Sequence, residues 1–314
     1  MALEAIHHGP SPLIFPKGLS TAGVPFLTAT PYFVHSGTGV AGNDGLSFDS
    51  PLATVDQAIN KCTAAKGDVI FVMPGHAETV TATSIALDVS GVSIIGLGTG
   101  LLRPTFTYGA AAATITVSAA NCAWRNCHLI GNFDNVAAAF TLGAAKDFQL
   151  TQNTISDNTA ALHFLSIVVT GSTDNDADGL TVIGNTWNAM ALAPDAFVSI
   201  LAAENRVEIA DNTVSMLATN DVGHFLTLST KIISNAKILR NTLNVTGSTG
   251  AAVGIFLTGS GSTSTGVVAY NLVSSLDTTA ELITTAGTGL KFFENYYTGT
   301  ADASGKLWPA VDLA

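Results

Sequence analysis

The sequence predicts an all-β fold, a single parallel β-helix of about 8–9 coils preceded by an extended arm and a short capping helix. One observation is a short motif that recurs along the chain at a period of roughly 28 residues, a length typical of solenoids. The other is that apolar and polar residues alternate within each copy, which indicates strands. No copy has an uninterrupted apolar helical stripe, which disfavours helical and leucine-rich repeats.

The clearest copy of the motif is residues 148–155, Phe-Gln-Leu-Thr-Gln-Asn-Thr-Ile. It returns at 180–187, 207–214, 236–243 and 290–297, and weaker copies surround the asparagines at 126 and 271. The marked asparagines are Asn126, Asn153, Asn185, Asn212, Asn241, Asn271 and Asn295. Their separations are 27, 32, 27, 29, 30 and 24 residues, and this regular spacing predicts one asparagine per coil.

A recurring asparagine has a physical reason in such a fold. Successive coils stack about 4.8 Å apart, so one position per coil forms a column of side chains. Asparagine both donates and accepts hydrogen bonds, so stacked amides can pair inside a turn. The alternative is that asparagine simply favours turns. That preference does not explain why asparagine recurs at the same position of the motif in seven copies. The ladder is therefore the favoured interpretation.

Residues 1–30 differ in composition from the rest of the chain. Four prolines within this segment, and Pro31 directly after it, interrupt short apolar clusters, and proline is excluded from helix interiors and central strands. We therefore expect an extended arm that binds along another surface, either a partner's or the chain's own coils, with the partner favoured. The apolar residues expected to make this contact are Leu13, Ile14, Phe15, Phe26 and Leu27.

Residues 31–66 are expected to form a first strand, a turn and a capping helix. Thr54 and Gln57 have the spacing of a capping box, and Val55, Ala58 and Ile59 begin an apolar stripe. Such a helix can cover the open end of the first coil. The coils are expected to span 67–297, and residues 298–314 leave the period and are expected to form a C-terminal cap.

Charge and cysteine content limit the partners. The chain has 12 Lys and Arg against 23 Asp and Glu, a net charge of −11, which argues against nucleic-acid binding. The sequence contains no run of 18 apolar residues, so no membrane-spanning helix is predicted. The first residues lack the features of a signal peptide. Three cysteines without paired spacing fit reduced thiols in a protein assembled in the cytoplasm.

The segments 32–37, 43–45, 50–59 and 67–75 resemble the opening of pectate-lyase-like right-handed parallel β-helix proteins, and the asparagine column is similar to that superfamily's ladder. More narrowly, the chain resembles β-helix proteins encoded among the structural genes of tailed bacteriophages. The resemblance covers about residues 32–297 and implies a right-handed parallel β-helix. It implies no single function, because this fold serves lyases, hydrolases, adhesins and structural proteins.

Catalytic motifs of the enzymatic relatives are largely missing, and no catalytic residue is predicted. Asn132-Phe133-Asp134 matches one polygalacturonase motif, but the sequence has no Asp-Asp, Gly-His-Gly or Arg-x-Lys. Asp174, Asp176 and Asp178 open a D-x-D-x-D-G sequence typical of a calcium loop. The twelfth position is Asn185 in place of the bidentate Glu, so a solvated acidic turn is the favoured alternative.

The resemblance to phage-encoded β-helix proteins, together with the missing catalytic motifs, implies a non-enzymatic virion protein, most simply a capsid decoration or cement protein. The arm, residues 1–30, is expected to attach it to the major capsid protein or another virion protein. A homo-oligomer is expected, with a trimer favoured, and calcium is the one cofactor considered. The alternative is a phage tailspike-type depolymerase, a glycoside hydrolase or lyase acting on host polysaccharide. A secreted adhesin ranks third.

Overall fold

The computed structural model describes residues 29–82, 84–190, 194–217, 224–228, 231–246, 257–258, 264–275, 289–299 and 302–308. The predicted arm contacts Leu13, Ile14, Phe15, Phe26 and Leu27 lie outside the described residues. Within the described residues, no helix is both long enough and apolar enough to cross a membrane.

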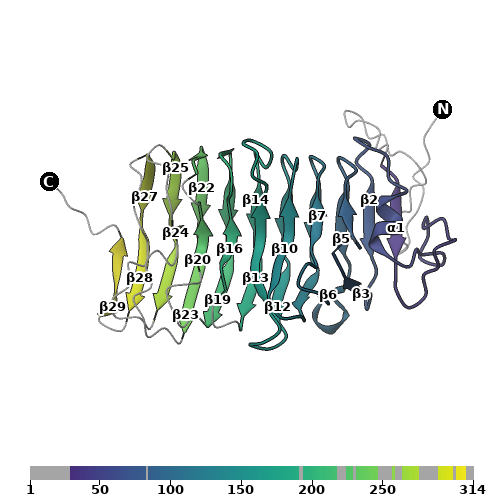
Figure 1. Ribbon diagram of the computed structural model, residues 1–314, viewed down its shortest axis with the longest axis horizontal. Helices are drawn as coiled ribbons and strands as arrows, with labels where there is room; N and C mark the ends of the chain where they lie inside the picture. The colour runs from purple at the N-terminus through teal and green to yellow at the C-terminus, as the bar shows by residue number, and fades with distance from the viewer. Residues whose placement is uncertain are drawn as a thin grey trace, which may run out of the picture.

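The chain forms an elongated right-handed solenoid whose strands lie side by side across its long axis (Figure 1). Three sheets run along the solenoid, and each coil contributes one strand to each sheet. The first sheet is parallel throughout and has ten strands: β1 (Pro31–Val34), β2 (Val69–Val72), β5 (Ser93–Gly96), β8 (Ala123–Arg125), β11 (Gln149–Thr151), β14 (Thr181–Ile183), β18 (Glu208–Ala210), β22 (Ala236–Leu239), β25 (Gly266–Ala269) and β27 (Leu290–Phe293).

The second sheet also has ten strands, of which the last is antiparallel. In spatial order they are β3 (Ala77–Val80), β6 (Thr105–Tyr108), β9 (His128–Gly131), β12 (Thr154–Asp157), β15 (Thr186–Ala189), β19 (Thr213–Leu217), β23 (Thr242–Thr246), β26 (Leu272–Ser275), β28 (Asn295–Gly299) and β29 (Asp302–Trp308). Strand β29 turns back along β28, so the parallel stacking of coils ends there.

The third sheet has seven parallel strands: β4 (Ala86–Leu87), β7 (Ile115–Val117), β10 (Val136–Leu142), β13 (Phe164–Thr170), β16 (Ala196–Ser199), β20 (His224–Thr227) and β24 (Leu257–Thr258). Two short strands, β17 (Glu204–Asn205) and β21 (Ile233–Ser234), pair separately, and η1 (Gly100–Leu102) is a 3₁₀ turn. Because complete coils need all three sheets, the solenoid has about seven turns, slightly fewer than the predicted 8–9.

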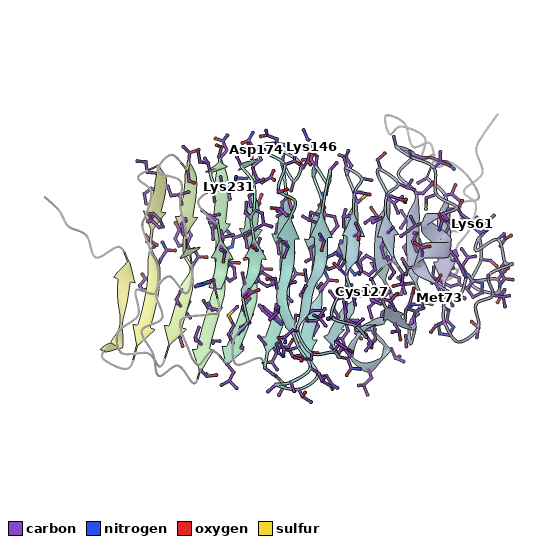
Figure 2. All side chains as sticks on the ribbon, viewed as in Figure 1. Lys61, Met73, Cys127, Lys146, Asp174 and Lys231 are labelled. Atoms are coloured by element: carbon purple, nitrogen blue, oxygen red, sulfur yellow. The ribbon has the colours of Figure 1, made fainter. Side chains whose placement is uncertain are left out.

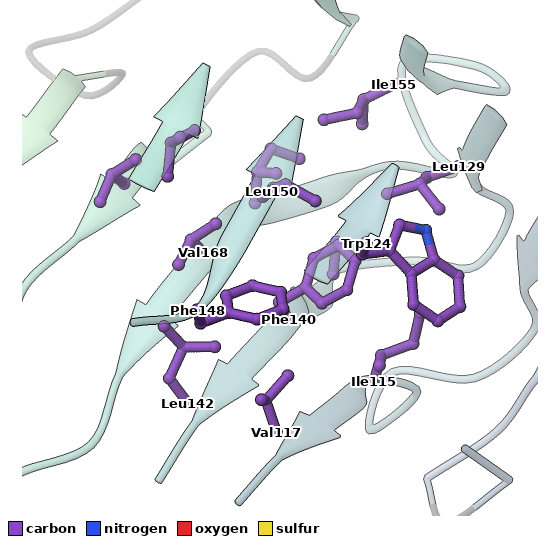
Figure 3. Packing of buried hydrophobic residues seen from close by; sticks show 14 of the residues in the cluster. Ile115, Val117, Trp124, Leu129, Phe140, Leu142, Phe148, Leu150, Ile155 and Val168 are labelled. Carbon is purple, nitrogen blue, oxygen red and sulfur yellow. The ribbon is translucent and has the colours of Figure 1, made fainter. Parts of the chain in front are cut away.

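The alternating sequence pattern places one set of side chains inside every coil. Leu150 pairs in register with Trp124 on one side and Val182 on the other, and all three are fully buried. Aromatic rings meet edge to face in the interior: the ring centroid of Trp124 lies 4.9 Å from that of Phe106 and 5.7 Å from that of Phe140. Figure 3 shows Trp124 and Phe140 among the buried side chains. Edge-to-face pairs at such distances stabilise a core beyond their buried area.

Six of the seven marked asparagines stack in one buried column. Asn153, Asn185, Asn212, Asn241, Asn271 and Asn295 are each 0–1% exposed. Along the column, the Nδ2 atom and the backbone N–H of each residue donate to Oδ1 of the next at 2.8–3.1 Å. Each turn between the first and second sheets therefore satisfies its buried amides through the following coil.

The prediction for Asn126 is wrong by one residue. The ladder position in that coil is Cys127, whose backbone N–H donates to Oδ1 of Asn153 at 2.9 Å. Asn126 itself has a φ of 57° and donates to the carbonyls of Gly96 and Gly98. It occupies the left-handed position that Gln152 occupies in the next coil, with a φ of 58°, and asparagine tolerates this conformation better than most residues.

Helix α1 (Val55–Ile59) lies across the open end of the first coil. Its N-cap is Thr54, whose hydroxyl accepts from the backbone of Gln57, and the Gln57 side chain accepts from the N–H of Thr54. Val55, Ala58 and Ile59 are buried against the solenoid. The helix thus covers core residues of the first coil that would otherwise be exposed to water.

Candidate functional site

A shallow groove of about 460 Å³ lies on the outer face of the third sheet and crosses strands β10, β13, β16 and β20. We call it the outer groove. Its floor consists of small side chains at equivalent positions in three coils, Ala138, Ser166 and Ala196, which are at most 4% exposed. Hydroxyl groups flank the floor on Thr141, Ser199 and Thr227.

The groove exists because the strands bend. In β10 the consecutive residues Ala139 and Phe140 are both fully buried, as are Ile167 and Val168 in β13. Strict alternation would send one of each pair outward, so each strand changes direction at this point. The outer surface is concave there, and only small residues fit along the floor.

Asp195 and His224 lie at one margin of the outer groove, on adjacent coils. The backbone N–H of His224 donates to the carbonyl of Asp195 at 3.0 Å, which fixes the two residues beside each other. Partial burial raises the pKa of the Asp195 carboxyl, and the nearby His224 opposes this effect. Proximity of an acid and an imidazole is the main reactive feature of the groove.

The chemistry available in the outer groove is limited. Hydrolysis of a glycosidic bond by the usual route needs two carboxyl groups facing each other across the bond. Among the described residues that line the groove, Asp195 is the one carboxylate, and none is Lys or Arg. A uronic-acid polymer would meet negative charge without a compensating cation. The groove is better suited to hold hydroxyl groups of a neutral ligand.

The predicted calcium turn does not form a metal site. Oδ1 of Asp174 accepts from the backbone of Ala203, and Oδ1 of Asp178 accepts from the backbone of Asn205, both on the next coil. The carboxylates of Asp174 and Asp178 thus join two coils. Across the described residues, no group of three or more His, Cys, Asp or Glu is placed to hold a metal ion. Figure 2 shows Asp174 at the edge of the solenoid.

Next to this turn, on strand β17 of the following coil, lies a buried acid that the sequence did not indicate. Glu204 is 2% exposed; its Oε2 accepts from the N–H of Ala177 at 3.0 Å, and its Oε1 has no hydrogen-bond partner. Burial raises the pKa of the Glu204 carboxyl to about 7, and the charges of Asp178, Asp176 and Asp174 contribute to the increase. Sequence patterns cannot reveal this residue, because its burial depends on how adjacent turns stack.

The N-terminal end of the solenoid has a different character. The backbone of Thr30, the second described residue, is held by the fully buried Asp68, whose Oδ1 accepts from Thr30 N at 2.6 Å. Lys66 donates to the hydroxyl of Thr30 at 2.6 Å. The first described residues are therefore fixed to the body by hydrogen bonds.

The loop of residues 36–50 lies at the same end of the solenoid and projects beyond β2 beside α1 (Figure 1). We call it the end loop. It exposes three large apolar side chains, with Val40 58%, Leu46 49% and Phe48 54% exposed. The Phe48 ring also packs against Phe33 of β1, with ring centroids 4.2 Å apart. The end loop thus presents three large apolar side chains to solvent.

Comparisons with known proteins give one informative result. No family model matches the chain, and no curated protein matches its sequence. Among solved structures, the chain is similar to a rhamnogalacturonan lyase, with a TM-score of 0.53, 14% identity, and coverage of 86% of this chain and 74% of that chain. The fold that the two chains share is the parallel β-helix. At this identity the likeness concerns architecture alone and transfers no catalytic residue to the β-helix described here.

Proposed function

We propose that this β-helix is a non-enzymatic structural component of a bacteriophage virion, most simply a capsid decoration protein held through its N-terminal end. The observation that carries the proposal is that two features lie at one end of the solenoid. Thr30, at the end of the predicted arm, is fixed by a hydrogen bond to Asp68, and the end loop exposes apolar side chains. A free-standing enzyme has no need of either feature. Asp195 is the one carboxylate among the described residues that line the outer groove, which supports a role without hydrolysis.

Attachment can be tested by complementing phage particles with variants of the full chain. We expect a chain lacking residues 1–28, and separately a Val40→Ser, Leu46→Ser, Phe48→Ser variant, to be lost from particles purified on a density gradient. Leu101→Ser with Leu102→Ser is a matched control, because these side chains are 102% and 60% exposed but belong to η1, on the side of the solenoid. Retention of both test variants on particles would contradict the proposal.

A second candidate function is the binding or cleavage of a host polysaccharide in the outer groove, as a tailspike would do. The groove across four coils and the pairing of Asp195 with His224 favour it, and the structural neighbour is by its name a polysaccharide lyase. Neutral and acidic polysaccharides should be incubated with the full chain, and reducing ends and unsaturated products measured. Activity that disappears in Asp195→Asn would favour this candidate over decoration.

A further inference from the structure

A buried histidine joins the start of the end loop to the rest of the solenoid. His76 directly precedes β3 and is 1% exposed, and its ring centroid lies 5.5 Å from that of Phe106. The backbone N–H of Ser36, the first residue of the end loop, donates to Nδ1 of His76 at 2.9 Å. The Ser36 hydroxyl also accepts from the N–H of Ala77 at 2.9 Å. Two hydrogen bonds therefore hold the start of the end loop against this turn.

These bonds determine the tautomer of His76. A backbone N–H only donates, so Nδ1 must present a lone pair to Ser36, and the ring proton lies on Nε2. Nε2 then donates to Oε2 of Glu78 at 3.0 Å. The same oxygen accepts from the N–H of Val55, the first residue of α1, at 3.0 Å, so a second element holds the carboxylate in place. The hydrogen bond from Ser36 thus requires a neutral imidazole.

Protonation of the ring removes one of these bonds. Both nitrogens of an imidazolium carry hydrogen, so Nδ1–H and the N–H of Ser36 would face each other as two donors. The Glu78 carboxylate stabilises the imidazolium, because opposite charges 3.0 Å apart attract each other. The ring is buried between Phe106 and Glu78, whereas Ser36 is exposed, so the backbone of Ser36 is the partner that moves away.

We infer that His76 is a pH-sensitive switch whose protonation loosens the start of the end loop, residues 36–38, from the solenoid. Histidine is the side chain that ordinarily gains charge between pH 8 and pH 5, so the loop start is held at neutral pH and detached in acid. From Gly39 onward the loop keeps its own bonds, such as that from Gly39 N to the carbonyl of His35 at 2.7 Å. Because the end loop is also the proposed attachment surface, acid should weaken attachment; that consequence rests on the proposed function, whereas the switch itself does not.

Glu78 is the one titratable group within hydrogen-bonding distance of the His76 ring in the part of the chain that the structure describes. Other charged or titratable groups lie on the elements around it: His35, Asp44 and Asp49 on the side of the end loop, Asp56 in α1, and Arg103 before β6. Arg103 donates to Thr154 on β12, away from β3. His35 is the group in this set that also titrates near neutral pH, and its Nδ1 lies 2.8 Å from the hydroxyl oxygen of Thr38.

Hydrogen–deuterium exchange of the free full chain tests the switch. After correction for the intrinsic effect of pH, the amides of residues 36–38 should exchange about threefold to tenfold faster at about pH 5 than at about pH 7.5, as loss of one hydrogen bond implies. His76→Asn should abolish this difference, because the asparagine oxygen can accept from Ser36 near the position of Nδ1 and does not titrate. His35→Asn is the matched control and should respond as the wild type does, since His35 adjoins the loop but does not accept from Ser36.

Nitrogen NMR of the histidine rings in the wild type is a second measurement that needs no variant to fold. His76 should be the Nε2–H tautomer at neutral pH and should gain its proton with the same pH midpoint as the change at the Ser36 amide. Exchange of residues 36–38 that does not depend on pH would overturn the inference. So would a neutral His76 in acid, two different midpoints, or a response that persists in His76→Asn or disappears in His35→Asn. None of these measurements involves a particle, so their failure is distinct from failure of the proposed attachment.

Discussion

Replacement of Asn212 by alanine is expected to destabilise the β-helix by removing one rung of the buried ladder. Oδ1 of Asn212 accepts from the backbone N–H of Asn185 at 2.9 Å, and Nδ2 donates to the carbonyl of Val182 at 2.8 Å. Both backbone groups are buried, and each loses this partner in the variant. The amide of Asn185 retains its bonds to the carbonyls of Leu150 and Ile183, so it is only partly affected.

The magnitude follows from these two groups. A buried donor or acceptor left unsatisfied costs about 1–3 kcal/mol, so the loss of both partners should lower the unfolding free energy by about 2–6 kcal/mol. The assay is urea denaturation of the full chain, followed by circular dichroism and compared with Asn188→Ala. Asn188 lies one coil earlier but points outward and is exposed, and its replacement should change stability by no more than about 0.5 kcal/mol.

The result that would refute the ladder is an Asn212→Ala variant as stable as Asn188→Ala. The Asn212→Asp variant tests the burial of this side chain through the direction in which stability changes with pH. Burial disfavours the charged carboxylate, so its folded-state pKa lies above the unfolded value, and stability should rise as the pH falls. An Asn212→Asp variant whose stability does not change with pH would show that this side chain is not buried.

Three further predictions concern other parts of the chain. Because the pKa of Glu204 rises from 4.5 to about 7 on folding, the folded state binds its proton more tightly, and stability should fall as the pH rises through this range. Glu204→Gln should therefore stabilise the chain by about 1–3 kcal/mol above pH 7 and flatten this dependence; an unchanged pH profile of thermal melting would count against a buried acid. Thr54→Ala should cost about 1 kcal/mol by removing the cap of α1, whereas no loss would mean that the helix end is held by packing alone. Chelation of divalent cations with EDTA should leave the melting temperature unchanged; a decrease would show that the turn of Asp174 and Asp178 binds a cation after all.

Much of the fold was predictable because it depends on local, repeated signals. Strand alternation and the asparagine spacing define the coils, and the Thr54–Gln57 box defines α1. The buried aromatic residues Trp124 and Trp187 also follow from the inward positions of their strands. The ladder residue of one coil was predicted wrongly by one position. Asn126 follows a strand as the ladder asparagines do, but it lies one residue earlier, in the left-handed turn position.

The candidate sites were less predictable because they depend on contacts between coils. The outer groove requires a bend in several adjacent strands, and nothing in the sequence of β10 alone predicts that Ala139 and Phe140 both face inward. Asp195 and His224 come together only when their coils stack. Likewise, residues 174–179 have the sequence that opens a calcium loop, but the carboxylates of Asp174 and Asp178 accept hydrogen bonds from the backbone of the next coil.

The orientation of this β-helix on a phage particle tests the central functional claim most directly. Cryo-electron microscopy of particles that carry the chain should show the solenoid standing on the shell by the end that contains α1 and the end loop, with β29 pointing away. Particles without the chain would contradict the account. So would density in which the β29 end or the outer groove makes the contact and the apolar residues of the end loop face solvent.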